Sequence, residues 1–110
     1  MPTLAELGFR SADCAIEPGM SAAERRLAAF APRLREYAAQ RDFPAIDGTS
    51  GLSAHLRFGT VSIRALVRLA LAMPGEGANA WLAELVWRDF YQAILAWRPD
   101  VVTHAFRPQF

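Results

Sequence analysis

Apolar residues recur at spacings of three and four over most of the chain, which is the periodicity of one face of an α-helix. The first such stripe follows residue 21 and contains Leu27, Phe30, Leu34 and Tyr37. The sequence SAAE before it is a capping box, so Ser21 is predicted to cap this helix with Glu24 as its partner. Pro32 lies inside the stripe and is expected to kink or split the helix near residues 28–32, because proline has no N–H to donate.

Two shorter helices are predicted in the middle of the chain. One is expected from about Ser50 to Phe58, where serine and threonine favour a helix start, and Gly59 is expected to stop it. Ser62 is expected to cap the next helix, which the turn-forming sequence PGEG at 74–77 breaks.

The last predicted helix spans about residues 79–97, with Asn79 as its cap and Pro99 beyond its end. No stretch alternates with period two for long, so the predicted fold class is all-α with about four to five helices. Residues 1–20 contain glycines and prolines with little periodicity and are expected to form a linker or arm. This leaves residues 21–110 as the helical unit.

On a helical wheel, the segment 81–97 has two faces. One face is apolar and is expected to pack in the core; it contains Leu82, Leu85, Val86, Phe90, Ala93, Ile94 and Trp97. The other mixes rings with charges and contains Trp81, Glu84, Trp87, Arg88 and Tyr91. Glu84 and Arg88 are expected to pair at a spacing of four, and Asp89, on the apolar side, is expected to need a partner.

The face of rings and charges has two interpretations. Rings can stack on a planar ligand, such as a base or an isoalloxazine, while a carboxylate accepts hydrogen bonds from it. Alternatively, Trp87 and Tyr91 pack half-buried between helices, and Glu84 and Arg88 form an ordinary surface pair. The helix taken alone favours this packing interpretation.

The sequence TSGLS places three hydroxyls and a glycine where a helix is predicted to begin. Exposed N–H groups and hydroxyls at a helix start suit a phosphate, and glycine allows close backbone approach. Caps of this composition are common, so a well-capped helix is the simpler interpretation of the segment in isolation. The residues concerned are Thr49, Ser50, Gly51, Leu52 and Ser53.

The charge pattern adds a weak indication of phosphate binding. The chain has 110 residues, of which 53% are hydrophobic, so it can form one modest core. All 12 basic residues are arginine, and eight of them lie within residues 25–70 against three acidic residues. Arginine suits phosphate recognition. Because the net charge is only +1, a solvated surface is the favoured interpretation.

Cysteine and histidine usage limits the chemistry further. Cys14 is the single cysteine, so no disulfide can form within the chain, which is compatible with a reducing compartment. Without a signal-peptide pattern or an apolar run of bilayer length, a cytoplasmic location without membrane contact is predicted. His55 and His104 are far apart in the sequence, so no metal site is expected and both are predicted to be structural or surface residues.

Several motifs taken together resemble one family. The sequences YAAQRDFPAIDGTSGLSAHLRFGTVS and WLAELVWRDFY follow the order found in the FAD-binding helical domain of DNA photolyases and cryptochromes. The similarity covers roughly residues 2–110 and corresponds to the N-terminal part of that domain. It implies FAD as cofactor, damaged DNA as partner, and light-driven repair of pyrimidine dimers as the activity of the full-length protein.

The resemblance also implies roles for individual residues. Glu84 and Trp87 are implied as catalytic residues at the lesion. Contacts with FAD are implied for Tyr37, Thr49, Ser50, Gly51, Leu52, Ser53, Trp81 and Arg88. Contacts with DNA are implied for Arg41, Glu84, Trp87, Arg88 and Tyr91.

Members of the family are much longer than this chain, so the resemblance implies a fragment with an incomplete flavin pocket. Such a fragment is expected to hold FAD weakly and to be inactive alone, and its uncovered apolar surface is expected to form a homo-oligomer. Three alternatives stay open: a cryptochrome-type photoreceptor, a non-enzymatic helical self-association module, and general nucleic-acid binding by the arginines of residues 25–70.

Overall fold

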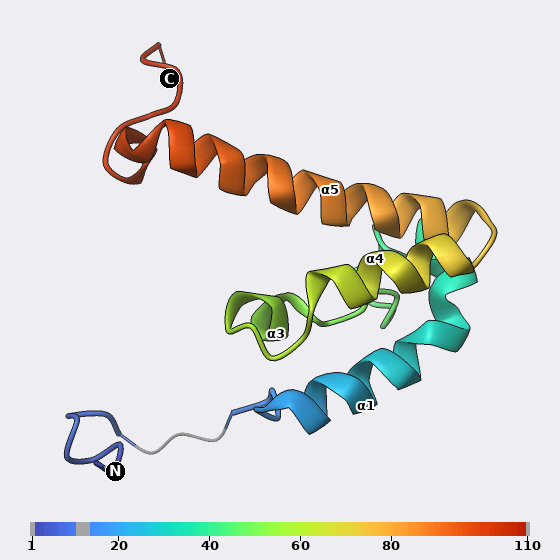
Figure 1. The fold of residues 1–110 in the computed structure, drawn as a ribbon, viewed down its shortest axis with the longest axis horizontal. Coiled ribbons are helices and arrows are strands. Elements are labelled where there is room, and N and C mark those ends of the chain that lie inside the picture. Colours follow the sequence, from blue (N-terminus) through green and yellow to red (C-terminus); the bar gives the residue numbers. More distant parts are fainter. Residues whose placement is uncertain (1, 11–13, 110) are drawn as a thin grey trace.

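The computed structural model describes residues 2–10 and 14–109, which form helices joined by loops (Figure 1). In chain order the elements are α1 (Met20–Phe30), the 3-10 helix η1 (Ala31–Glu36), α2 (Tyr37–Gln40), α3 (Ser53–Arg57), α4 (Ile63–Ala72), α5 (Glu76–Trp97) and the 3-10 helix η2 (Pro99–Val102). The described residues contain no strand, so the all-α prediction is confirmed. None of their helices has the length and apolar character needed to cross a bilayer.

The first helical stripe is split at Pro32, as predicted. The α-helix α1 stops two residues before the proline, and the chain tightens into η1 before α2 resumes the α-helical geometry. The predicted capping box is wrong. Gly19, with a φ of 94°, is the N-cap and α1 begins at Met20, so Ser21 already lies inside the first turn.

The middle helices begin and end close to their predicted signals, with one difference. Gly59 has a φ of 67° and follows the end of α3, and Ser62 is the N-cap of α4, both as predicted. The helix predicted from Ser50, however, begins only at Ser53. The backbone carbonyl of Ser50 accepts a hydrogen bond from the side chain of Arg26, so it is not engaged in a helical turn.

The helix α5 begins three residues earlier than predicted. Gly75, with a φ of 128°, is its N-cap, and Asn79 lies in the first turn, where its N–H donates to the Gly75 carbonyl at 3.1 Å. This early start depends on Gly77. A Cβ at that position would meet the carbonyl oxygens of Leu34 and Arg35, so only glycine lets α5 lie directly against η1.

One core joins the helices to the loop before α3. Phe30 packs on Trp81 with ring centroids 5.2 Å apart and meets Tyr37 edge-on at 6.0 Å. Leu34 and Leu66 are fully buried at its centre. The buried cluster consists of Phe30, Leu34, Tyr37, Leu52, Leu66, Ala70, Ala78, Trp81 and Leu85.

The predicted core face of α5 is wrong in its second half. Val86, Phe90 and Trp97 were expected inside but are 61%, 49% and 83% exposed, whereas Trp81 is buried. The physical reason is the length of the neighbouring helices. The second half of α5 runs past the start of α4 (Figure 1), so Phe90 and Trp97 have little to pack against, whereas Val86 follows the buried Leu85 and lies on another side of the helix.

The segment before α1 lies at one end of the molecule (Figure 1). Its described residues, 2–10 and 14–19, are all exposed. Local bonds shape it, since the Thr3 backbone N–H and hydroxyl both donate to the Glu6 carboxylate. The division of the chain into an arm over residues 1–20 and a helical domain over residues 21–110 stays a prediction.

Candidate functional site

Residues 49–53, called the hydroxyl loop below, lie directly before α3. Leu52 is 1% exposed and anchors the loop in the core, while Thr49 and Ser53 stay exposed. Gly51 has a φ of 63°, in the left-handed region that favours glycine. The loop therefore holds its hydroxyl groups near the surface on a backbone that the core fixes.

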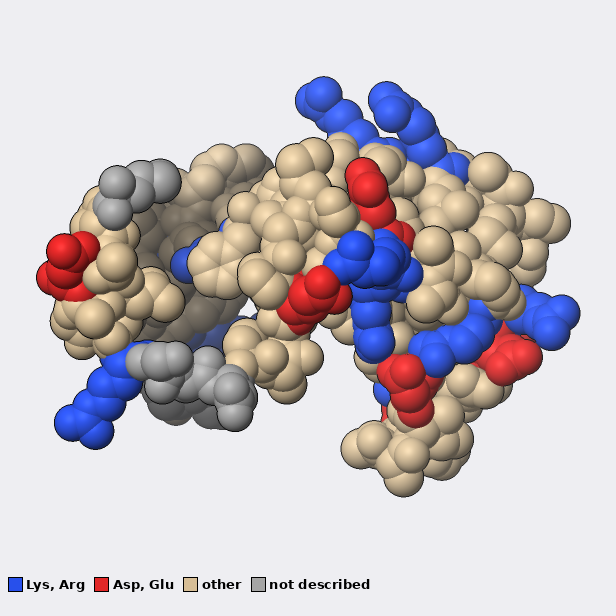
Figure 2. Space-filling view, turned by 90° about the horizontal axis from the view of Figure 1, so that it is seen from below, with Lys and Arg blue, Asp and Glu red and all other residues tan. Residues whose placement is uncertain are grey.

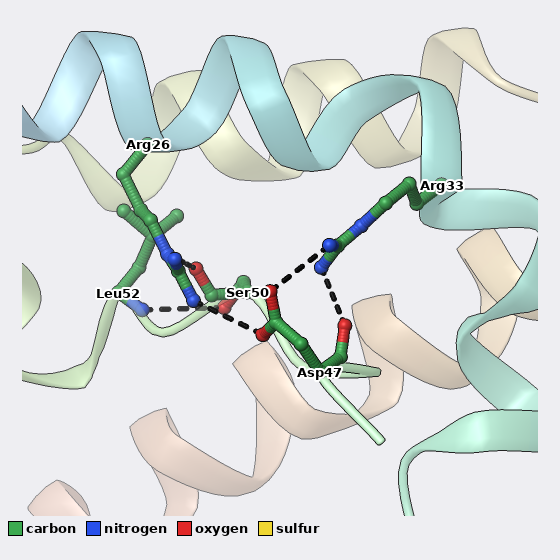
Figure 3. Close-up of polar contacts among 5 residues, drawn as sticks. All are labelled: Arg26, Arg33, Asp47, Ser50 and Leu52. Carbon is green, nitrogen blue, oxygen red and sulfur yellow. Dashed lines mark hydrogen bonds and ion pairs between the residues drawn. The ribbon is translucent and has the colours of Figure 1, made fainter.

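Two arginines of the first helical stripe bond to the hydroxyl loop and to Asp47 just before it (Figure 3). Arg26 donates from Nε to the Ser50 carbonyl at 2.9 Å and from Nη2 to Asp47 Oδ1 at 3.3 Å. Arg33 donates from Nη1 to Asp47 Oδ2 at 3.0 Å and from Nη2 to the Asp47 carbonyl at 2.6 Å. The hydrogen bond from Arg33 is the main reason why the pKa of Asp47 lies below its ordinary value.

A cavity of about 530 Å³ adjoins the hydroxyl loop. It lies between the segment before α1, the first turns of α1 and the start of α3. Its lining residues are Ala15, Ile16, Glu17, Ala22, Arg25, Arg26, Gly51, Ser53 and His55. Arg25 and Glu17 form an ion pair at its edge. The cavity thus offers a hydroxyl and guanidinium groups to one ligand.

A second cluster forms where α2 meets the middle of α5. Arg41 Nη1 donates to Glu84 Oε1 at 2.5 Å, and the Arg41 guanidinium lies 5.5 Å from the Tyr37 ring centroid. The hydrogen bond to Glu84 raises the pKa of Arg41. Burial raises the pKa of the Tyr37 phenol, and the positive charge of Arg41 opposes that shift.

The predicted pair between Glu84 and Arg88 is wrong. Glu84 bonds instead to Arg41, which α2 brings beside it from 43 positions earlier in the chain. Arg88 turns the other way and donates from Nη2 to the Leu56 carbonyl of α3 at 3.4 Å. Partners from other helices therefore replace the contact within one helix, and they connect α5 to both α2 and α3.

Beyond Leu85, rings gather on the surface of α5. Trp87 and Tyr91 are stacked with centroids 6.1 Å apart, and Phe90 meets Trp87 edge-on at 5.4 Å. The three side chains are about half exposed or more, and together they are called the aromatic surface below. Asp89, expected on the core side, is exposed, so water solvates its carboxylate and the expected need for a partner is wrong.

The residues with predicted roles fall into two groups. Glu84, Trp87, Arg88 and Tyr91 lie along one stretch of α5, with Arg41 beside Glu84. By contrast, three residues that were predicted to contact a cofactor have their side chains in the core: Tyr37, Leu52 and Trp81. Their packing accounts for these residue types without any ligand. Contacts of all these residues with flavin or DNA stay predictions.

No signal in the sequence indicated the arginine contacts around Asp47. Arg33 and Asp47 are 14 positions apart and Arg26 and Asp47 are 21, across a break in the helix. No periodicity connects such positions. His55 has a structural role, as predicted: it is buried, and its Nδ1 lies 2.9 Å from the Thr60 hydroxyl.

No metal site is visible in the part of the chain that the structure describes, where no three histidine, cysteine, aspartate or glutamate residues gather suitably. The face shown in Figure 2 carries no continuous basic surface. There, acidic and basic groups lie beside one another. Arg25, Arg26, Arg33, Arg35 and Arg41 each form an ion pair.

Comparison with known proteins shows what the chain is related to. It is 41% identical to a deoxyribodipyrimidine photo-lyase of Synechococcus sp. over 97% of this chain and 24% of that protein. It is 34% identical to the photo-lyase of Halobacterium salinarum over the same shares. With the photo-lyase of Escherichia coli it shares 42% identity over 63% of this chain and 16% of that protein. No family model matches the chain.

These matches confirm the resemblance to the photolyase family. The chain is homologous to one segment of the deoxyribodipyrimidine photo-lyases and spans about a quarter or less of the length of the relatives named above.

Proposed function

We propose that this chain contributes the flavin-phosphate loop and part of the lesion-binding helix of a deoxyribodipyrimidine photolyase, an FAD-dependent enzyme that uses light to repair pyrimidine dimers in DNA. The observation that carries the proposal is the convergence of its motifs. Arg41, from the first motif, bonds to Glu84 of the last. Leu52, from the TSGLS motif, shares a core with Trp81 and Leu85 of α5.

The hydroxyl loop suits the phosphates of FAD. Thr49, Ser50 and Ser53 carry hydroxyl donors, and the guanidinium of Arg26 lies against the loop backbone at Gly51. The adjoining cavity of about 530 Å³ is polar where Arg26 and Ser53 line it. This donor set fits a diphosphate, which accepts hydrogen bonds and carries negative charge.

The middle of α5 suits a flipped-out pyrimidine lesion. The Glu84 carboxylate can accept hydrogen bonds from the N–H groups of the pyrimidines, while the ring of Trp87 can pack on their faces. Arg41 holds the carboxylate in place and adds a positive charge suited to the DNA backbone. When bound, reduced flavin supplies the light-excited electron that splits the dimer, and these residues position the lesion for it.

A titration of the purified chain with FAD tests the cofactor part of the proposal. Bound flavin is expected to gain structure in its visible absorption spectrum and to lose fluorescence. Replacing the exposed hydroxyls, as in Thr49→Val with Ser53→Ala, should weaken binding, whereas Ser21→Ala in the first turn of α1 should not. A spectrum of FAD that stays that of free flavin at high protein concentration would contradict binding by these 110 residues.

Binding of a DNA strand that carries one thymine dimer tests the lesion part. The chain is expected to prefer the damaged strand to the intact one, because Glu84 and Trp87 recognise the exposed pyrimidines. Glu84→Gln and Trp87→Ala should each reduce that preference, and Glu24→Gln, which removes the same charge from an exposed position of α1, serves as the charge control. Equal binding of both strands, falling steeply with salt, would indicate general nucleic-acid binding instead.

A second candidate function is self-association without catalysis. The aromatic surface and its neighbours expose apolar groups, with Val86 at 61% and Trp97 at 83%, and such surfaces commonly mark interfaces. Sedimentation of the chain and of Trp87→Ala distinguishes the two functions. Loss of an oligomer in the variant, together with unchanged behaviour toward FAD and damaged DNA, would favour the self-association module. The reported relatives are all named as lyases, which favours repair over the photoreceptor alternative.

A further inference from the structure

Position 51 of the hydroxyl loop is the place where an arginine from α1 meets the loop backbone. A Cβ at Gly51 would lie 2.5 Å from Nη2, 2.7 Å from Nε and 2.8 Å from Cζ of Arg26. No side-chain atom can approach a guanidinium that closely. The Arg26 guanidinium therefore occupies the space that a side chain at position 51 would fill.

Arg26 also has donors left after it has fixed the loop. Of the five N–H bonds of a guanidinium, one goes to the Ser50 carbonyl and one to Asp47 (Figure 3). The other three find no hydrogen-bond acceptor among residues 2–10 and 14–109. Arg26 and Gly51 both line the cavity of about 530 Å³, so the Arg26 side chain borders that cavity.

The neighbouring arginines are arranged differently. Arg33 directs both of its bonds to Asp47, and it does not line the cavity. Arg25 lines the cavity and pairs with Glu17 at its edge, but among the described residues it has no hydrogen bond to the hydroxyl loop. Arg26 alone among these three both contacts the loop backbone and borders the cavity.

We propose that Arg26 is a phosphate-recognition and positioning residue of the hydroxyl loop, and that glycine at position 51 lets the Arg26 guanidinium lie against the loop backbone. This proposal rests on the proposed function of the loop as a diphosphate site and adds a residue from α1 to it. Arg26 holds the Ser50 carbonyl in place and presents N–H donors to a phosphate group in the cavity. The expected ligand of the hydroxyl loop and Arg26 is a diphosphate or a diphosphate ester.

The direct test uses nuclear magnetic resonance of the ¹⁵N-labelled chain with inorganic pyrophosphate and ADP as probes. Saturable shifts are expected for the amides of Gly51, Leu52 and Ser53. Arg26→Gln should weaken binding by about tenfold or more, because hydrogen bonds to a charged group are each worth about 1.5–3 kcal/mol. Arg35→Gln, which removes the same charge from an exposed pair with Glu36, should leave the affinity unchanged.

Position 51 offers an independent test with a matched control. Gly51→Ala should displace the Arg26 guanidinium from the loop backbone and weaken pyrophosphate binding, although less than Arg26→Gln does. Gly59→Ala provides the control, because Gly59 has nearly the same φ, 67° against 63°, but faces open space. Both alanine variants share the backbone strain, so only the clash with Arg26 distinguishes them.

The outcomes separate this inference from the proposed function. If pyrophosphate binding depends on Arg26 but FAD binds no more tightly than ADP, the role of Arg26 is supported and the proposed binding of flavin is contradicted. Equal affinities of Arg26→Gln and Arg35→Gln, or a wild-type chain that binds no pyrophosphate, would overturn it. If Arg26→Gln fails to fold, Arg26→Lys decides, since lysine keeps the charge but loses the planar fork and should bind less tightly than the wild type.

Discussion

The two halves of α5 have similar apolar content and opposite surroundings. In the first half, Gly77, Ala78, Trp81 and Leu85 are buried against η1, α2 and α4. In the second half, large side chains such as Trp97 remain exposed. The difference shows that an apolar stripe reports which face of a helix can be buried, while the elements across from it decide whether it is. The predicted ligand-binding residues Glu84, Trp87 and Arg88 lie at the boundary between the packed half and the exposed half of α5.

Replacing one tryptophan in each half of α5 tests this difference with the largest expected effect. Trp81→Ala is expected to lower the free energy of unfolding by about 3–5 kcal/mol, because it leaves a cavity beside Phe30 in the core. Trp97→Ala, which removes the same side chain from an 83% exposed position, should change it by less than about 0.5 kcal/mol. Urea unfolding followed by circular dichroism measures both.

Equal losses for the two variants would show that the second half of α5 is also packed in solution. If Trp81→Ala does not fold, Trp81→Phe keeps a ring at the site and should still lose more stability than Trp97→Phe. The same ranking is then read from the thermal midpoints.

The sequence predicted those parts of the fold that depend on local geometry. Pro32 splits the first stripe and Gly59 follows the end of α3 because these residues restrict or free the backbone wherever they occur. The face of α5 was not predictable in this way. Trp81 and Val86 exchanged their expected environments because Phe30 of α1 packs on Trp81, and such a tertiary contact decides which side of the helix is covered.

The candidate site shows the same division. Ordered motifs indicated Glu84, Trp87 and the hydroxyl loop, since each is a contiguous run of residues. The partners of these residues were missed, because Arg41 reaches Glu84 across 43 positions and Arg26 reaches Ser50 across 24. Pairing between distant positions follows from the fold and leaves no periodic signal in one sequence.

The close contact between α5 and η1 gives the second prediction, which concerns the packed half alone. Gly77→Ala should destabilise the chain by about 1–3 kcal/mol, because the new methyl group would meet the Leu34 and Arg35 carbonyls, which are backbone atoms with little freedom to move. Ala83→Gly, at an exposed position of the same helix, should cost about 1 kcal/mol through helix propensity alone. Thermal unfolding measures both, and a stabilised Gly77→Ala would contradict the contact.

The ion pair at the border of the two halves gives the third prediction. A double-mutant cycle with Arg41→Gln and Glu84→Gln should yield a coupling of about 1 kcal/mol, the upper end for pairs that are still partly exposed. Arg98 and Asp100 form a more exposed pair beyond the end of α5, with two hydrogen bonds between residues only two positions apart. A double-mutant cycle at this pair should give a smaller coupling energy for global unfolding. A coupling energy larger than that of Arg41 and Glu84 would contradict the proposed contrast between the two halves of α5.

Lowering the pH is expected to have the smallest effect on stability. This effect distinguishes the hydroxyl loop from the packed half of α5. The pKa of Asp47 is lowered in the folded chain, so between that value and the ordinary one of about 3.9 the unfolded chain binds the proton and the folded chain does not. Stability therefore falls as the pH decreases through this range, while the contribution is fully present above it. Protonation weakens the hold of Arg26 and Arg33 on the loop but leaves the apolar packing of Leu52 and Trp81 in place.

Amide resonances of the loop should accordingly shift below about pH 4, before the indole resonance of Trp81 changes. Asp47→Asn is the matched variant, because it keeps the shape of the side chain and removes its titration. Its loop resonances should resemble those of the acidified wild type and change little with pH. A loop that titrates identically in both proteins would show that another group controls it, and a simultaneous change at Trp81 would show that the loop and the packed half of α5 unfold as one unit.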